Sequence, residues 1–72
     1  MVEPGHVYAH HRGGRYLVLH LCTECTKDRR GRTGVVYASL TSGEIRHRDH
    51  EEFVEPVMWP DGLMRPRFIR SS

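Results

Sequence analysis

The stretch HVYAHHRGGRYLVL, residues 6–19, decides the fold. Two runs with alternating apolar residues flank a turn sequence that contains Gly13 and Gly14. Alternation with a period of two is typical of half-buried β-strands, and paired glycines allow the positive φ angles of a tight hairpin. We therefore predict a β-hairpin with strands over residues 6–11 and 15–23.

The second of these strands is the most apolar segment of the chain. A strict period of two puts Leu17, Leu19 and Leu21 on one face, and the opposite face then carries Tyr16, Val18, His20 and Cys22. Because both faces carry apolar groups, we expect this strand to lie at the centre of the sheet.

The rest of the chain repeats short β-type runs separated by turns. Further strands are predicted over residues 35–40, 45–48 and 67–69, with a turn at Pro60–Gly62. Asp49 has the position of a helix N-cap, so residues 49–53 are expected to form one helical turn with Phe53 pointing inward. The predicted fold is mainly β, a small five-stranded meander or half-open SH3-like barrel with one short helical turn.

The chain of 72 residues is long enough for one domain, which we place at residues 6–70 between a leader, 1–5, and a tail, 71–72. No run approaches the ~18 apolar residues of a membrane span, and the first five residues lack the features of a signal peptide. The only cysteines are Cys22 and Cys25, too few for a secreted disulfide scaffold. We therefore expect a cytoplasmic protein with no membrane partner.

Charge is distributed unevenly along the chain. Residues 27–33 carry four basic groups and one acid, a net charge of +3, whereas residues 44–56 carry two basic groups and five acids, a net charge of −3. Such patches can attract each other within one chain or between two copies. They also argue against a continuous surface for nucleic acid.

Several blocks of the sequence resemble the bacterial domain-of-unknown-function family numbered 1653. The resemblance spans about residues 5–69 and depends on the following blocks: Tyr8 to Leu19, Val35-Val36-Tyr37, Gly43 with Arg48, Phe53-Val54, and Arg65 to Phe68. It implies a compact, mostly β domain without an established activity. The family usually has proline after the arginine equivalent to Arg48, where this chain has Asp49, and the two cysteines fall in its variable loop.

The sequence CTEC, residues 22–25, has the spacing of a zinc knuckle with His20 just upstream. One such pair cannot complete a tetrahedral shell, and no second cysteine pair follows. Other histidines, His6, His10, His11, His47 and His50, could complete it only if the fold brings them there. We therefore prefer half-buried structural cysteines and expect neither a metal nor a cofactor, and a redox role is disfavoured because the motif ends a strand.

Basic and aromatic residues gather in the blocks that carry the resemblance. They suggest a ligand-binding surface made of Tyr8, His10, Arg12, Tyr16, Arg48 and Arg67. The alternative is that Tyr8, His10 and Tyr16 only pack across the hairpin. No catalytic residues are assigned, because no nucleophile accompanies a base in a recognisable motif.

Three functions stay open from the sequence. The first is a non-enzymatic binding module for a small anionic ligand such as a nucleotide, an acidic peptide or nucleic acid. The second is a small enzyme acting on a nucleotide or phosphoester, with His10 as acid/base and Arg48 as anion clamp, and it requires both residues to share an accessible concavity. The third is a homo-oligomeric structural module, with a homodimer as its simplest form.

Overall fold

The structure is a computed structural model that describes all 72 residues apart from the side chain of Arg29. It contains seven strands, one 3₁₀ turn and one short α-helix. In chain order these are β1 (Val7–His10), β2 (Arg15–Thr23), η1 (Lys27–Arg29), β3 (Thr33–Ser39), β4 (Ile45–Asp49), α1 (His50–Phe53), β5 (Pro56–Met58), β6 (Met64–Pro66) and β7 (Phe68–Arg70). The mainly β class with one short helical turn is confirmed.

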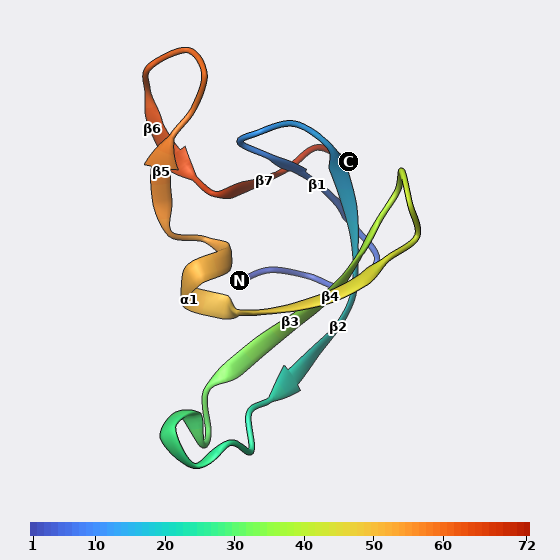
Figure 1. The fold of residues 1–72 in the computed structure, drawn as a ribbon, viewed down its shortest axis with the longest axis vertical. Helices are drawn as coiled ribbons and strands as arrows, with labels where there is room; N and C mark the ends of the chain where they lie inside the picture. Colours follow the sequence, from blue (N-terminus) through green and yellow to red (C-terminus); the bar gives the residue numbers. More distant parts are fainter.

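Five strands form one antiparallel sheet in the order β4-β3-β2-β1-β7. β2 lies at the centre, as its two apolar faces predicted. The sheet curls but is not closed, since β4 and β7 form its two edges, so the half-open, SH3-like form holds (Figure 1). The β1–β2 hairpin turns through Gly13 and Gly14, whose φ angles of 98° and 87° are accessible to glycine at little cost.

The predicted facing of β2 is wrong in its second half. The pairing of β2 with β3 shifts between Val18 and His20, which marks a β-bulge. After the extra residue, the side chains of β2 point to the opposite faces from those predicted. Leu21 therefore packs against the core on the same face as Val18, and not on the face of Leu17. A strict period of two cannot detect such an insertion.

The core is an aromatic cluster on the inner face of the curled sheet. Phe53 and Phe68 stack with ring centroids 3.9 Å apart, and the ring of Tyr37 packs edge-on against both. Val18 and Val35 are fully buried beside them. Burial of these side chains supplies most of what stabilises so small a domain.

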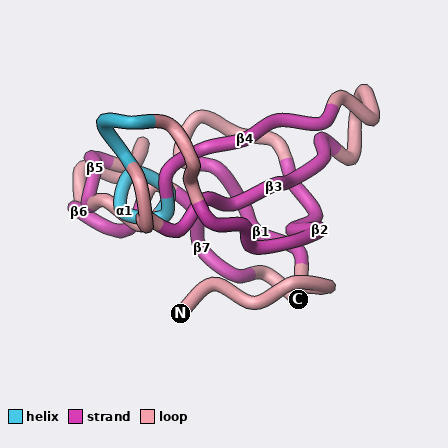
Figure 2. Tube along the Cα trace, turned by 90° about the horizontal axis from the view of Figure 1, so that it is seen from below, coloured by secondary structure: helices cyan, strands magenta, loops and turns pink.

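Helix α1 begins where Asp49 accepts a hydrogen bond of 2.9 Å from the backbone N–H of Glu51. The predicted cap and the inward Phe53 are both confirmed. The helix and the β5–β6 hairpin lie on the same side of the five-stranded sheet, as two views show (Figures 1 and 2).

The β5–β6 hairpin was not predicted beyond its turn at Pro60–Gly62. Its strands have three residues each, and Pro56 pairs with Pro66, so neither the length nor the composition gives a strand signal. Its turn is fixed by Asp61, whose carboxylate accepts from the backbone of Leu63 and pairs with Arg65.

The two ends of the chain are held against the sheet. Val2 is buried in the core, and the backbone N–H of Ser71 donates to the carbonyl of Val7. Among the described residues, no helix combines the length and the apolar character that crossing a membrane requires.

Candidate functional site

His10 and Arg48, two of the six predicted ligand-binding residues, lie against the ring of Phe68, and the charge of Arg67 acts on His10. His10 packs edge-on against Phe68 with centroids 4.8 Å apart, and the guanidinium carbon of Arg48 lies 5.9 Å from the centre of the same ring. Arg67 immediately precedes Phe68. We call His10, Arg48, Arg67 and Phe68 the basic aromatic surface.

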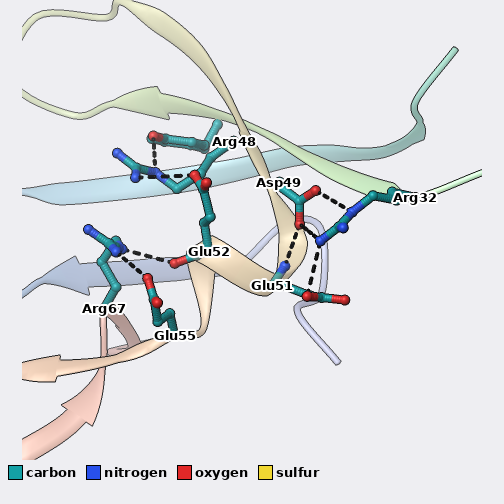
Figure 3. A network of polar contacts seen from close by, with 8 residues as sticks. Arg32, Arg48, Asp49, Glu51, Glu52, Glu55 and Arg67 are labelled. Atoms are coloured by element: carbon teal, nitrogen blue, oxygen red, sulfur yellow. Dashed lines mark hydrogen bonds and ion pairs between the residues drawn. The ribbon is translucent and has the colours of Figure 1, made fainter. Parts of the chain in front are cut away.

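Arg48 reaches this surface because alternation along β4 turns it toward the inner face of the sheet. Its Nε donates to the hydroxyl of Tyr37 at 3.4 Å, and one terminal nitrogen lies 4.0 Å from the carboxylate of Glu52 (Figure 3). Its side chain keeps 31% of its accessible surface. A guanidinium has five N–H groups, so Arg48 retains donors for a ligand.

Arg67 also contacts Glu52. It lies just before β7, the edge strand opposite β4. Its Nε donates to the backbone carbonyl of Glu52 at 2.9 Å, and a terminal nitrogen pairs with the carboxylate of Glu55 at 2.7 Å (Figure 3). The Arg67 side chain is 21% exposed. Both arginines are therefore oriented by protein acceptors while part of each side chain still faces solvent.

His10 is held as a neutral ring. Burial, which is the largest cause, and the positive charges of His11, Arg48, Arg67 and Arg12 together lower the pKa of His10 from 6.5 to about 4. Its Nδ1 accepts from the backbone N–H of Arg12 at 3.1 Å, so the proton of the neutral ring lies on Nε2. At neutral pH this histidine can donate one hydrogen bond.

Of the other predicted residues, Tyr16 also lies against Phe68, whereas Tyr8 and Arg12 have different positions. Tyr8 is only 7% exposed, packs edge-on against Phe53 and accepts a hydrogen bond from the backbone of Glu3, so it belongs to the core beneath the surface. Tyr16 is partly buried, with its ring against Phe68. The Arg12 side chain is exposed on the β1–β2 turn.

Two surface hollows lie elsewhere. One has a volume of about 360 Å³ and is open, and three glutamates are among its lining residues, which are Arg32, Glu51, Glu52, Val54, Glu55 and Pro56. A smaller one is lined by Met1, Arg32, Thr33, Asp49, His50 and Glu51. Neither includes His10 or Arg48, so these two residues do not share either hollow.

The oppositely charged segments attract each other within the chain. Arg32, from the basic segment, pairs with Asp49 at 2.8 Å and with Glu51 at 3.0 Å (Figure 3). Glu51 and Glu52 are exposed, as expected for a solvated helix turn.

A second group of chemically reactive side chains lies on the opposite face of the sheet. One donor atom each from Cys22, Glu24 and His47 lies within 4.8 Å of the others. The sequence motif contains Cys22 and Glu24, but only the pairing of β3 with both β2 and β4 brings His47 to them. The contribution of Glu24 was missed, although its place between two cysteines was the signal that could have indicated it.

Comparisons with known proteins agree with this fold. The family model described as "Protein of unknown function (DUF1653)" matches residues 6–70. A crystal structure of a DUF1653 protein from Bordetella bronchiseptica is 30% identical, with a TM-score of 0.77, and the match covers 99% of this chain and 88% of that one. No curated protein sequence matches significantly. The resemblance found in the sequence is thereby confirmed, and this chain belongs to the DUF1653 family.

Proposed function

We propose that this domain is a non-enzymatic binding module whose basic aromatic surface holds a single oxyanion, either the carboxylate of an acidic peptide or the phosphate of a nucleotide. One observation carries the proposal: Arg48 and Arg67 are both partly buried next to His10, each with donors left over. Partial burial strengthens a charge-assisted hydrogen bond, and the planar guanidinium suits a two-oxygen acceptor.

A compact anion fits this surface better than a long polyanion. Glu52 and Glu55 lie beside the two arginines and would repel further negative charge along a nucleic-acid strand. The aromatic rings next to the arginines are mostly core residues, so they offer little area for stacking successive bases.

The geometry supports binding more than catalysis. A general base acts best with a pKa near the working pH, whereas His10 has a pKa of about 4 and its Nδ1 is occupied by the Arg12 backbone. The two described hollows are lined by neither His10 nor Arg48. These residues are therefore better suited to donate hydrogen bonds than to move protons.

A cytoplasmic location is part of the proposal. Both cysteines are unpaired, which suits a reducing compartment. Charge-driven assembly into dimers has less support, because Arg32 already pairs with Asp49 and Glu51 of its own chain.

The test is a titration of ¹⁵N-labelled protein with inorganic phosphate, adenosine monophosphate, a glutamate-rich peptide and a single-stranded oligonucleotide. We expect the backbone amide resonances of His10, Arg48 and Arg67 to shift when the peptide or the phosphate compounds are added. The probe that binds with the higher affinity identifies the oxyanion. The absence of shifts at His10 and Arg48 with every probe would refute the proposal.

Arg48→Lys tests the role of the guanidinium. We expect binding to weaken about tenfold, or about 1.4 kcal/mol, because an ammonium cannot reproduce two parallel hydrogen bonds. Arg70→Lys is the matched control, since Arg70 is an exposed arginine of β7 that pairs with Glu3 at 3.4 Å. Equal losses in both variants would indicate nonspecific attraction to positive charge.

A further inference from the structure

Three side chains with metal-binding donors converge at the end of the sheet where β2 gives way to the loop. Cys22 lies near the end of β2, Glu24 follows that strand, and His47 comes from β4. The carboxylate of Glu24 lies 2.6 Å from Nε2 of His47 and 4.0 Å from Sγ of Cys22. All three donor atoms lie within 4.8 Å of one another.

The point of convergence lies directly above Gly34 of β3. Gly34 pairs with Cys22 on one side, while His47 of β4 pairs with Val36. A Cβ on Gly34 would lie 2.8 Å from Sγ of Cys22, 2.9 Å from a carboxylate oxygen of Glu24, and closer still to Nε2 of His47. The missing side chain is therefore what allows the three donors to approach each other.

The donor set points to a thiophilic divalent ion. Thiolate, imidazole and carboxylate are the three ligand types of zinc, whereas calcium and magnesium prefer oxygen alone. Cys25 follows Cys22 with the two-residue gap of zinc-binding motifs. It is exposed, and its thiol donates to the carbonyl of Thr23 at 3.8 Å.

We propose that Cys22, Glu24 and His47 form a zinc-binding site, with Cys25 as the fourth ligand. The bound ion would tie the end of β2 and its loop to β4. Binding releases the two thiol protons, so the ion is held by two thiolates, one imidazole and one carboxylate.

Among the three clustered donors, only small movements are needed to reach the ligand spacings of zinc, whereas Cys25 must turn from the carbonyl of Thr23 toward them. Oxygen and nitrogen ligands of tetrahedral zinc are about 3.4 Å apart, and oxygen and sulfur ligands about 3.6 Å, from bond lengths of about 2.1 Å to oxygen and nitrogen and about 2.3 Å to sulfur. The His47–Glu24 pair must therefore open and the Cys22–Glu24 pair close, each by less than about 1 Å. The His47 side chain, which is 40% exposed, can make this adjustment, whereas Glu24 is held in place by burial.

The competing explanation is an ordinary ion pair between His47 and Glu24 with a neighbouring thiol. This explanation predicts no zinc binding. Two titrations of the reduced, metal-free chain distinguish the zinc site from the ion pair. Zn²⁺ is added in competition with a chromophoric chelator to measure affinity and stoichiometry. Co²⁺ is added to observe the sulfur-to-cobalt charge-transfer absorption. We expect one ion per chain and a charge-transfer intensity typical of two thiolates.

The variants Cys22→Ser and His47→Gln test the ligands directly. Each should weaken zinc binding by more than about a hundredfold, beyond the tenfold to hundredfold that loss of an outer-shell partner costs. His20→Gln is the matched control, because His20 is exposed and lies in the same cross-strand row as His47, on the other side of Val36, but outside the donor group. A ¹H–¹⁵N spectrum of each metal-free variant verifies that it is folded.

Two results overturn the proposal. One is the absence of stoichiometric zinc binding by the reduced wild-type chain, and the other is wild-type affinity in folded Cys22→Ser or His47→Gln. Cys25→Ser should halve the charge-transfer intensity and weaken binding; an unchanged spectrum would remove Cys25 from the ligand set.

Discussion

Arg48 and His47 are neighbours in β4, yet they belong to two different sites on opposite faces of one sheet. Arg48 points inward, to the ring of Phe68 and the hydroxyl of Tyr37. His47 points outward, to Glu24 above Gly34. The period of two along a strand therefore lets one segment of five residues supply both.

The two faces are built by different means. On the inner face, large aromatic rings fill the curl of the sheet and hold the basic residues at their rim. On the outer face at His47, the absence of a Cβ at Gly34 creates the space that the donor atoms of Cys22, Glu24 and His47 occupy. We therefore expect the inner face to govern stability and the outer site to respond to metal.

The largest effect should come from Phe53→Ala, which removes a fully buried ring that packs against Tyr8, Tyr37 and Phe68. Loss of a buried phenylalanine costs about 3–5 kcal/mol, comparable to the whole stability of so small a domain. The variant should therefore be largely unfolded by circular dichroism and urea titration. Met58→Ala, at a 63% exposed position, is the control. A cooperative transition near that of the wild type in Phe53→Ala would show that the aromatic cluster is not the core.

The adjacent pair in β4 permits a crossed test of the two sites. His47→Gln should reduce zinc affinity by more than about a hundredfold and leave oxyanion binding unchanged, because it touches only the outer face. Arg48→Lys should do the reverse, with a loss of about tenfold in oxyanion affinity. Both affinities are measured on both variants. If either substitution weakens both zinc binding and oxyanion binding, the two sites are coupled through β4, and the claim that they are independent is wrong.

The same comparison can be made on stability with the neighbouring valines of β3. Val35 is fully buried on the inner face, and Val36 is half-buried on the outer face. At about 0.8 kcal/mol for each buried methyl-sized group, Val35→Ala should cost about 2 kcal/mol and Val36→Ala less than about 1 kcal/mol. Urea unfolding of both variants measures the difference. Equal costs would mean that the outer face is also covered in solution.

Much of this architecture could be predicted because its signals are local. The Gly13-Gly14 turn, the apolar centre at β2 and the cap at Asp49 each follow from residues close in sequence. His10 and Arg48 were predicted only as members of a set of site residues, because no local sequence signal shows that both lie against the ring of Phe68.

The features that escaped prediction depend on geometry without a sequence signal. The bulge after Val18 inserts one residue into an otherwise regular alternation. The β5–β6 hairpin has strands too short to show a period. Glu24 and His47 are brought together by the registers of the β2–β3 and β3–β4 pairings. The motif in residues 22–25 contains no information about those registers, so it could not indicate His47 as a partner.

The smallest expected effect concerns the protonation of His10. Its pKa is about 4 in the folded chain and about 6.5 when unfolded, so between these values the unfolded chain binds more protons. The contribution of the neutral His10 ring to the free energy of unfolding is fully present above pH 6.5 and is lost as the pH falls toward 4. The effect is modest, because the ring is half-buried and solvent screens its charge.

This dependence can be isolated by comparing the wild type with His10→Gln in urea at several pH values between 7 and 4. The wild type should lose more stability than the variant across this interval, and the ring protons of His10 should titrate with a midpoint near 4. His20→Gln, at an exposed position, should retain the wild-type dependence. A midpoint near 6.5 for His10 would mean that the ring is not buried beside the arginines in solution, and His10 would then become charged at mildly acidic pH.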